Sequence, residues 1–580
     1  MTHTPAPPPS LGAELIELLR RRFGSSTITH VEDVPASSAQ FAPWPAWVLP
    51  ELKQVLIDAS VTAPYTHQAQ CAQSVRDGND TVIATGTSSG KSLGYQLPIL
   101  TALAEDPKAC ALYLTPTKAL GSDQLQATLR MTSQIPQLSG VHPAPYDGDT
   151  PTEARAGIRE ASRFVFSNPD MLHAGLLGAH PRWARFLRQL RFVVVDECHT
   201  YRGVFGANVS LVLRRLLRIA AAYGSHPVVV FASATAADPA GQASRLCGRS
   251  VTAITEDTAP TGSRTITLWE PGFIEGAEGE NGAPVRYAAS TEAASIMSTL
   301  MQEGARTLTF VRSRRAAETV ALRAQEDLVV AGRADMAGRV ASYRAGYLAE
   351  DRRKLERALD EGDLLGLATT NALELGIDVG GLDAVVMAGF PGTVASFRQQ
   401  AGRAGRRGQA SVVVMVARDE PMDTYLVHHP DALLGRPVES SVFNPQNPYI
   451  LRGHVYCAAV ERPLSHADVD AFGAHEVVEE LEREGYLRRR PRGWFATPQL
   501  EGELTPETAH SVVSLRGGTG EEVLIVDATD GRLLGTVDAA RAATQVHDGA
   551  VYLHQGESFV VQELDLDGYV ALVAPETPDY

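Results

Sequence analysis

Residues 81–92 join a short β-branched run to a turn of small residues and then to a helical pattern. The stretch reads Thr81-Val82-Ile83-Ala84-Thr85-Gly86-Thr87-Ser88-Ser89-Gly90-Lys91-Ser92. Small residues let successive backbone N–H groups converge on phosphate oxygens at the start of a helix. Lys91 can then reach the outer phosphates, and the Ser92 hydroxyl can bind Mg²⁺. The stretch predicts a nucleotide-phosphate loop, although Thr85 replaces the glycine usual six residues before the lysine. The alternative is a plain turn ahead of a helix.

The region from Val82 to Ala232 alternates between apolar strand candidates and helical segments. The strand candidates are Val82–Ala84, Ala111–Leu114, Phe164–Phe166, Phe192–Val195 and Val228–Phe231. This alternation predicts a parallel sheet covered by helices on both faces. Ligands of such sheets bind at the carboxyl ends of the strands, and the polar motifs of this region follow the strands directly.

An acidic pair follows the fourth strand candidate, in the run Asp196-Glu197-Cys198-His199. Asp196 at the strand end would lie near the metal held by Ser92 on the phosphate loop. Glu197, one residue later, can polarise an attacking water. The alternative is a simple strand cap. Together with the phosphate loop, the pair predicts a metal ligand and a catalytic base.

Small hydroxyl residues follow three other strands. Such residues suit hydrogen bonds to a sugar–phosphate backbone, which needs no reading of bases, although each alone is ordinary turn chemistry. The predicted nucleic-acid contacts are Thr115, Pro116, Thr117, Lys118, Ser167, Asn168 and Asp170. Ser233 and Thr235, together with His199, are predicted to couple ATP turnover to movement of the strand.

A glutamine upstream of the loop is a candidate adenine contact. Gln68 lies 23 residues before Lys91 in the run Tyr65-Thr66-His67-Gln68. Its side chain could form two hydrogen bonds with the adenine edge while Tyr65 packs on the ring. The alternative is a polar residue that opens a helix.

A second alternating region spans residues 291–440, after an acidic, glycine-rich stretch at 256–290 with one strand, Thr265–Trp269. Its strand candidates are Thr307–Val311, Leu365–Ala368, Ala384–Met387 and Val412–Val416, and it contains no second phosphate loop. Nucleic-acid contacts are assigned to Arg312, Ser313, Thr369, Thr370 and Asn371, and nucleotide contacts to Gly376 and Asp378.

The run from Gln399 to Arg407 carries Arg403 and Arg406. Two arginines three residues apart on one helical face suit a γ-phosphate reached from a facing domain. Glycines in a helix are unfavourable unless close approach is needed, which argues against a plain basic helix end. Gln399, Arg403 and Arg406 are therefore predicted to act in catalysis.

The C-terminal part changes character. Helical stretches at Tyr449–Val460 and His475–Glu484 precede a basic hairpin, which resembles a winged helix with a basic wing. The arginines and the aromatic beside them favour nucleic acid over a solvated hairpin. The hairpin contacts are Arg488, Arg489, Arg490, Arg492 and Trp494. Residues 512–574 read as β-rich, with strands at Val523–Val526, Leu533–Val537, Gly549–Leu553 and Phe559–Leu564.

Composition sets further limits. A chain of 580 residues, 44% hydrophobic and 21% charged, is expected to form three or four globular domains. The five cysteines are far apart, which argues against a disulfide framework and a zinc site. The proline-rich start lacks a secretory signal and no apolar run reaches membrane-spanning length, so we expect a cytoplasmic protein. The net charge of −16 says little against nucleic acid, because binding depends on local basic stripes.

With these motifs in order, residues 60–430 resemble a superfamily II helicase, in which two RecA-like domains hold ATP and Mg²⁺ in the cleft between them. The loop, the Asp196–His199 box, the run Tyr146-Asp147-Gly148-Asp149-Thr150 and the β-rich tail resemble the Hrq-type branch of RecQ-like helicases. That branch includes SftH and the mitomycin repair factor A proteins. The resemblance implies 3′-to-5′ translocation on single-stranded and tailed duplex DNA, and a role in repair. Family members usually continue into a zinc domain with four clustered cysteines, which this chain is expected to lack.

The sequence thus predicts an α/β protein with two RecA-like parallel-sheet domains, a winged-helix domain and a small β-rich domain. The expected boundaries are 1–50 for an N-terminal extension, 51–255 for the first RecA-like domain, 256–290 for a linker, 291–440 for the second RecA-like domain, 441–500 for the winged helix and 501–580 for the β-rich domain. The expected activity is ATP-dependent DNA unwinding. Two alternatives stay open: an RNA-directed helicase, and an ATP-switched nucleic-acid clamp that does not unwind.

Overall fold

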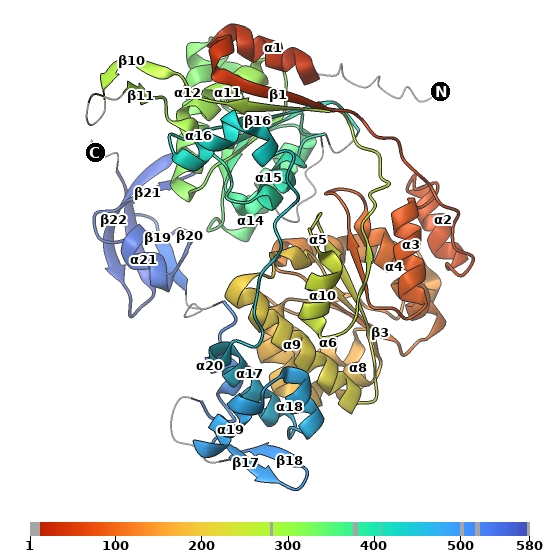
Figure 1. The fold of residues 1–580 in the computed structure, drawn as a ribbon. Helices are drawn as coiled ribbons and strands as arrows, with labels where there is room; N and C mark the ends of the chain where they lie inside the picture. The colour runs from red at the N-terminus through yellow and green to blue at the C-terminus, as the bar shows by residue number, and fades with distance from the viewer. Residues whose placement is uncertain are drawn as a thin grey trace. The chain divides into compact units, whose positions relative to one another are not determined.

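The computed structural model describes residues 12–278, 282, 284–374, 381–405, 408–498, 504–516 and 522–576. The chain forms two compact units, and each is built from separate stretches of sequence (Figure 1). Unit I contains Gln40–Ala259 and Glu439–Gly517. Unit II contains Met1–Ala39, Pro260–Val438 and Gly518–Tyr580.

Unit I is built on a seven-stranded sheet with the order β4-β5-β3-β6-β7-β2-β8, in which all neighbours run parallel. The strands are β2 (Thr81–Ala84), β3 (Cys110–Leu114), β4 (Ala144–Pro145), β5 (Phe164–Ser167), β6 (Leu190–Val195), β7 (Val228–Ser233) and β8 (Thr252–Ile254). The five predicted strands are therefore confirmed. The short outer strands β4 and β8 were not predicted.

Alternate residues of each strand enter two different cores, so helices cover both faces of this sheet. Val193 and Val195 pack in one core and Val194 packs in the other. The helices of this domain are α2 (Pro50–Asp58), α3 (Thr66–Arg76), α4 (Lys91–Glu105), α5 (Lys118–Thr132), α6 (Thr152–Ala161), α7 (Pro169–Met171), α8 (Ala184–Arg188), α9 (Gly203–Ala222) and α10 (Pro239–Cys247).

The second part of unit I is the predicted winged helix, and Figure 1 shows its hairpin extending from the helices. Its elements are α17 (Pro448–Glu461), α18 (His466–Phe472), α19 (His475–Arg483), β17 (Leu487–Arg490), β18 (Gly493–Ala496) and α20 (Ala509–Val512). The basic hairpin predicted from the sequence is confirmed, since β17 and β18 pair antiparallel with Arg489 opposite Trp494.

Unit II is built on a second seven-stranded sheet with the order β1-β9-β16-β15-β12-β14-β13. Its strands are β1 (Ile28–Val34), β9 (Arg264–Trp269), β12 (Thr307–Phe310), β13 (Val340–Tyr343), β14 (Gly366–Thr369), β15 (Ala384–Ala388) and β16 (Ser411–Val416). Its helices are α1 (Gly12–Phe23), α11 (Ala289–Gln302), α12 (Arg314–Val330), α13 (Ala334–Ala337), α14 (Ala349–Glu361), α15 (Val394–Ala401) and α16 (Pro421–His428). The four strands predicted for residues 291–440 are confirmed.

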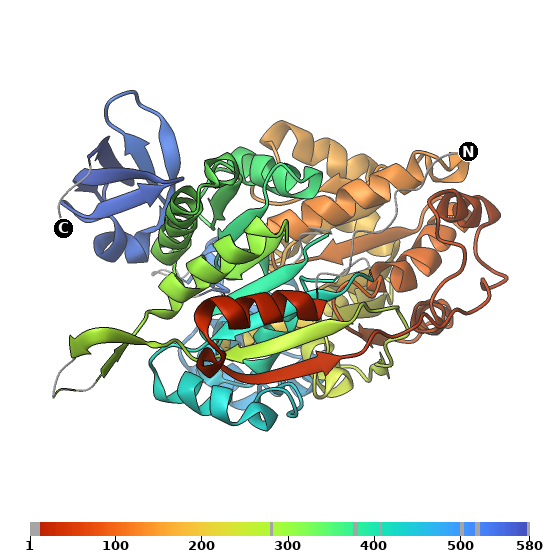
Figure 2. The ribbon, with the colours of Figure 1, turned by 90° about the horizontal axis from the view of Figure 1, so that it is seen from above.

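Two boundaries differ from the expected ones. Strand β9, expected within a linker, pairs in parallel with β16, and β1, expected within a separate extension, pairs antiparallel with β9. Figure 2 shows the red helix α1 lying over this part of the sheet, where Leu15, Ile16 and Leu19 pack in one core with Trp269. Both segments thus belong to the second sheet, because pairing and burial join residues that are more than 200 positions apart. A hairpin, β10 (Phe273–Glu278) with β11 (Pro284–Arg286), follows β9.

The β-rich domain of unit II is a five-stranded sheet with the order β20-β19-β23-β22-β21. Its elements are β19 (Glu522–Asp527), β20 (Leu533–Asp538), α21 (Ala539–Gln545), β21 (Val551–His554), β22 (Glu557–Asp565) and β23 (Val570–Pro575). The four predicted strands are confirmed and β23 is added. Across the described residues of both units, no helix has the length and apolar character needed to cross a membrane.

Candidate functional site

The phosphate loop lies between β2 and α4 and is held by its own polar groups. The Thr85 and Ser89 hydroxyl oxygens are 2.6 Å apart, and Ser89 Oγ donates to the Gly86 carbonyl at 2.9 Å. Lys91 Nζ donates to the same carbonyl at 2.8 Å. Gly90 has a φ of +72°, and a Cβ there would lie 2.5 Å from the Gln68 amide nitrogen. The left-handed backbone favours glycine at this position, and a Cβ there would require the Gln68 amide to move.

The acidic pair follows β6, as predicted. Asp196 is buried, its Oδ2 accepts from the Tyr113 hydroxyl and its Oδ1 accepts from the Glu197 N–H at 2.9 Å. Burial and the neighbouring Glu197 charge raise the pKa of Asp196 to about 6, although Tyr113 and Lys91 act in the opposite direction. A carboxylate in this position favours a nearby cation, because the cation offsets the cost of burying the negative charge.

Glu197 has a left-handed backbone, with a φ of +47°, which is a strained conformation for a residue other than glycine. Its Oε2 lies 3.4 Å from His199 Nδ1. The Ala234 N–H donates to that same His199 nitrogen at 3.2 Å, and Ser233 Oγ lies 3.4 Å from it. His199 therefore connects the acidic box to the segment after β7. Thr235 follows and is exposed.

The strands that carry these motifs are neighbours in the sheet, in the order β6-β7-β2. Because all three run parallel, their carboxyl ends meet at one edge. The loop, the acidic box and Ser233 therefore come together at the edge where ligands of such sheets bind, as the sequence predicted.

Helix α3 begins beside the loop. The Tyr65 N–H donates to the Gln68 side-chain oxygen at 2.8 Å, and the Gln68 amide donates to the Gly90 carbonyl at 2.9 Å. The Tyr65 ring lies 5.3 Å from the ring of Phe41. These contacts correspond to the alternative reading of Gln68, a polar residue that opens a helix. The adenine contact remains a prediction.

Two residues at the loop were not predicted from the sequence. His67 Nε2 lies 3.0 Å from the Ser89 carbonyl oxygen, and the Gly86 N–H donates to Asp257 Oδ2 at 2.8 Å. Asp257 is 171 positions from Gly86, so no local pattern signals their contact. His67 stands within the predicted Tyr65–Gln68 run, but its sequence neighbours do not reveal its partners.

The candidate nucleic-acid residues of the first sheet lie at the ends of the neighbouring strands β3 and β5. The hydroxyl of Thr115 donates to the Thr117 carbonyl, next to Pro116, and that of Ser167 donates to the Tyr146 carbonyl at 2.6 Å. Asn168 accepts from the Met171 N–H at 2.8 Å and so caps α7. These side chains shape the strand ends through local contacts. Their contact with nucleic acid remains a prediction.

The two charged members of this set form ion pairs on the surface. Lys118 Nζ lies 2.6 Å from Asp149, and Asp170 lies 2.9 Å from Arg516. Arg516 also lies over the Phe205 ring, 4.4 Å from its centroid. Arg516 was missed because it follows the winged helix, 346 positions after Asp170. It adds a cation at this edge of the sheet.

In unit II, the predicted residues lie at the ends of β12 and β14 and around α15. Arg312 is exposed, 3.7 Å from Glu420, and Ser313 caps α12 through the Ala316 N–H. Thr369 and Thr370 are buried and Asn371 is exposed. Gln399 is buried on α15.

The arginine prediction needs a correction. Helix α15 ends at Ala401, so Arg403 lies in a turn and not on a helical face. Gly402 and Gly405 explain this ending, since glycine is a poor helix former and Gly405 has a φ of +75°. Arg403 is buried and donates to the Glu374 carbonyl. The other predicted residues here, Gly376, Asp378 and Arg406, lie outside the described residues.

The hairpin also brings a correction. Arg488, Arg489, Arg490 and Arg492 are exposed as predicted, but Trp494 is only 8% exposed and its indole N–H donates to Glu482 at 3.0 Å. Trp494 faces inward because it packs in the winged-helix core, so its ring offers no stacking surface for a base. The guanidinium of Arg490 lies 5.2 Å from the centroid of the half-buried Phe495 ring.

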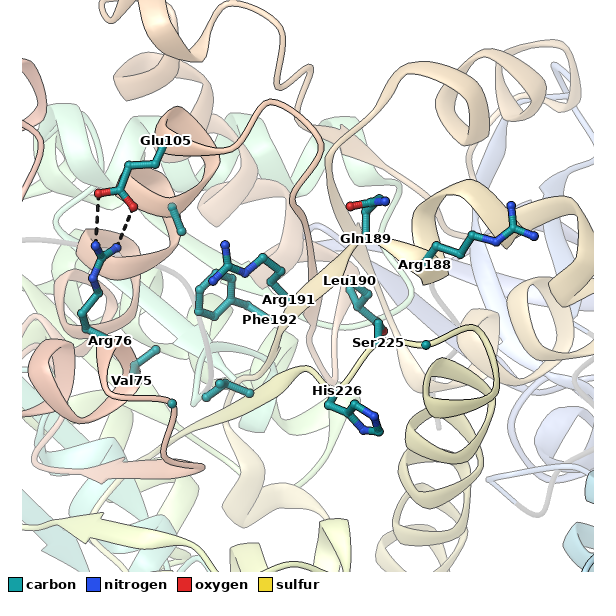
Figure 3. A pocket seen from close by; sticks show the side chains of 14 residues that line it. Val75, Arg76, Glu105, Arg188, Gln189, Leu190, Arg191, Phe192, Ser225 and His226 are labelled. Carbon is teal, nitrogen blue, oxygen red and sulfur yellow. Dashed lines mark hydrogen bonds and ion pairs between the residues drawn. The ribbon is translucent and has the colours of Figure 1, made fainter.

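A cavity of about 410 Å³ lies at the opposite edge of the unit I sheet, at the amino ends of β6 and β7 (Figure 3). Its lining includes Arg188, Arg191 and His226, together with Arg76, which forms hydrogen bonds of 2.8 and 3.1 Å with Glu105. None of the motif residues described above lines it. Within the described residues, no group of three or more metal-ligating side chains is placed to hold an ion.

Three segments of the chain match known families, in order along the sequence. Residues 65–242 match the DEAD/DEAH box helicase family and residues 292–408 match the helicase conserved C-terminal domain. Residues 443–518 match the winged helix domain of ATP-dependent helicase HRQ1.

Individual proteins are similar over nearly the whole chain. The sequence is 37% identical over 572 residues to the uncharacterized ATP-dependent helicase YprA of Bacillus subtilis, covering 98% of this chain and 74% of YprA. It is 37% identical over 570 residues to the ATP-dependent helicase HRQ1 of Saccharomyces cerevisiae, covering 97% of this chain and 52% of HRQ1. The crystal structure of the DUF1998 helicase MrfA bound to DNA and AMPPNP aligns with a TM-score of 0.89 and 37% identity, covering 98% of this chain and 77% of that one.

The chain thus spans about three quarters of YprA and of the MrfA chain, and about half of the yeast protein. The matches fall on the same segments that carry the phosphate loop, the acidic box, the arginine turn and the basic hairpin. This chain belongs to the ATP-hydrolysing helicases of superfamily II, in the Hrq-type branch that contains HRQ1 and MrfA.

Proposed function

We propose that this protein is an ATP-driven DNA helicase that moves 3′-to-5′ along single-stranded DNA and acts in DNA repair. The observation that carries the proposal is the meeting of the phosphate loop, the acidic box and Ser233 at the carboxyl ends of three adjacent strands. The DNA substrate is supported by the DNA-bound MrfA structures, and the direction and the repair role by the resemblance to Hrq-type helicases.

The proposed nucleotide site uses Lys91 and the backbone of residues 86–90 for the phosphates, with Gln68 and Tyr65 on the adenine side. Ser92 and Asp196 would hold Mg²⁺, which when bound neutralises phosphate charge. The donor set fits this ion, because Mg²⁺ prefers hydroxyl and carboxylate oxygens. The raised pKa of the buried Asp196 fits as well, since a cation would stabilise its ionised form.

Glu197 is the proposed base that polarises the attacking water. Glu197 follows Asp196 directly, has a left-handed backbone, and its Oε2 lies 3.4 Å from His199 Nδ1. His199 contacts both Glu197 and the Ser233–Ala234 segment, so a movement of Glu197 on ATP hydrolysis would also move the residues that follow β7. Ser233 and Thr235 would pass this change on to the bound strand.

Arg403 and Arg406, with Gln399 beside them, are proposed to stabilise the charge on the γ-phosphate from unit II. Such an arginine is worth roughly 10³–10⁵ in rate in related NTPases. The strand ends of both sheets would grip the sugar–phosphate backbone, through Thr115 to Lys118, Ser167 to Asp170, Arg312, Ser313 and residues 369–371. The exposed hairpin arginines would hold phosphates where the duplex opens.

The test is unwinding of partial duplexes that carry either a 3′ or a 5′ single-stranded tail, in DNA and in matched RNA. We expect ATP-dependent unwinding of the 3′-tailed DNA, and no unwinding by the Glu197→Gln variant. Unwinding of 5′-tailed duplexes alone would overturn the direction, and a preference for RNA would overturn the substrate. ATP hydrolysis that is stimulated by DNA without strand separation would indicate a clamp.

A further inference from the structure

His67 joins the phosphate loop to the segment by which the chain leaves unit I. Its Nε2 lies 3.0 Å from the Ser89 carbonyl oxygen, at the end of the loop. Its Nδ1 lies 2.7 Å from the Thr258 hydroxyl, and its backbone N–H donates to that same hydroxyl at 3.1 Å. The Thr258 N–H adds a third contact, to Nδ1 at 3.2 Å.

These contacts define the state of the ring. Nε2 must carry the proton to donate to the Ser89 carbonyl, so Nδ1 is free to accept from Thr258. Burial lowers the pKa of His67 below its ordinary value, which keeps the ring in this neutral form. His67 itself has no exposed surface and Thr258 is 2% exposed, so water does not compete for these hydrogen bonds.

The start of the loop is tied to the same segment. The Gly86 N–H donates to Asp257 Oδ2 at 2.8 Å, one residue before Thr258. Asp257 thus holds the start of the loop directly, and Thr258 contacts the end of the loop through His67. The next residue, Ala259, is the last of unit I, and the chain enters unit II at Pro260.

The chain first passes between the units after Ala39, and this first connecting segment pairs with the second, which crosses after Ala259. The Gln40 N–H donates to the Thr258 carbonyl at 3.0 Å, and the Gln40 carbonyl accepts from the N–H of Thr66, the residue before His67. On the unit II side, Ser37 and Thr261 exchange backbone hydrogen bonds of 3.0 and 3.2 Å. The two connecting segments thus pair with each other on both sides of the boundary.

We propose that His67 is a positioning residue that, through Thr258, couples the phosphate loop to the paired segments connecting the two motor units. The coupling rests on the proposed function, in which ATP binds the loop and the arginines of unit II complete the site. A shift of the connecting segments would change the position of Ser89 and Gly86, and nucleotide in the loop would restrain the connecting segments in turn. Such reciprocity is required of any coupling between a binding site and a moving element.

The Thr258 hydroxyl allows a selective test. Thr258→Val keeps the shape of the side chain and removes only the hydroxyl that contacts His67, while Thr258→Ser keeps the hydroxyl. Thr255→Val is the matched control, because Thr255 is an exposed threonine of the same segment. His67→Ala removes the contacts at both ends of the ring. Each full-length variant is checked by thermal unfolding before assay.

The measurements are KM for ATP, kcat with single-stranded DNA, and the ATP hydrolysed per base pair unwound. We expect Thr258→Val, which removes both hydrogen bonds of that hydroxyl to His67, to raise KM by roughly threefold to tenfold, the size of the net free energy of about one hydrogen bond, and to raise the ATP used per base pair while kcat stays within about twofold. Thr258→Ser and Thr255→Val should match the parent. His67→Ala should show the larger change in KM.

Parental KM and parental ATP use in both Thr258→Val and His67→Ala would overturn the coupling. A defect in Thr258→Val that Thr258→Ser shares would overturn it too, because packing and not the hydroxyl would then be responsible. Failure of the proposed function is distinguishable, since the parent protein would then show no DNA-stimulated ATP hydrolysis.

Discussion

A buried ion pair joins the first motor domain to the winged helix within unit I, and its disruption should cause a large loss of stability. Arg215 on α9 and Glu461 at the end of α17 are both fully buried, and Arg215 Nε donates to Glu461 Oε1 at 3.1 Å. The other side of the guanidinium donates to His173 Nδ1 at 3.0 Å and to His454 Nδ1 at 2.9 Å. His510 Nε2 lies 3.0 Å from the same Glu461 oxygen.

Replacing Arg215 with Met would leave Glu461 buried without its principal charge partner. Burial alone would raise the pKa of Glu461, but the Arg215 guanidinium and the His510 ring lower it to about 2. Removing one member of a buried ion pair typically destabilises a protein by 3–5 kcal/mol, and we expect a loss of about that size. The combined variant Arg215→Met/Glu461→Leu should recover much of the loss, because neither charge then remains in the core.

The assay is equilibrium denaturation of the single and double variants, followed by ATP hydrolysis on single-stranded DNA for the folded fraction. Arg202→Met is the control, because Arg202 is an exposed arginine that directly precedes α9. A loss below about 1 kcal/mol in Arg215→Met would refute the reasoning, and so would a double variant that is less stable than the single one.

Further predictions concern catalysis, pH and DNA binding. Glu197→Gln should bind ATP and fail to hydrolyse it, and parental turnover would contradict its role as base. Arg406→Ala should reduce turnover far more than nucleotide affinity, and an equal loss in both would make it a simple binding residue. Burial lowers the pKa of His173 to about 3, so the unfolded chain binds its proton first, and this histidine alone should lower the stability by about 2 kcal/mol from pH 7 to pH 5, measured by denaturation at each pH; the buried His454, whose pKa is also lowered, should add to the fall. Arg489→Ala/Arg490→Ala should preserve ATP hydrolysis on single strands, lower unwinding and flatten the salt dependence of duplex binding.

The positions of the loop and the acidic pair at their strand ends were predicted correctly because they depend on short stretches of sequence, while the roles of these residues remain predictions. The run from Thr81 to Ser92 contains its own strand, turn and helix start, and Asp196 follows an unbroken apolar strand. In both places the local pattern fixes where the side chains lie relative to the sheet, because the carboxyl ends of parallel strands form one edge. No distant residue is needed to place them.

The parts that were missed depend on partners far away in the chain. Arg215 looks like one more polar residue of a helix, and its burial depends on distant partners such as Glu461, 246 positions later. Asp257 lies in a loop whose composition is that of any linker. Trp494 was misjudged for a related reason: a tryptophan beside arginines suits a nucleic-acid surface, but here the ring packs in the winged-helix core and its indole N–H donates to Glu482.

The division of the chain into units also could not be predicted from the sequence, because it too depends on contacts between residues that are far apart in the chain. The chain passes between the units after Ala39, Ala259, Val438 and Gly517, so each unit is completed by segments that return from the other. Strand β1 is held in unit II by its ladder with β9, and the winged helix is held in unit I by the Arg215 cluster and by Arg218, whose Nε lies 2.9 Å from Asp468. The buried Arg215–Glu461 pair and the Arg218–Asp468 pair thus join the domain that carries the basic hairpin to the first motor domain within unit I.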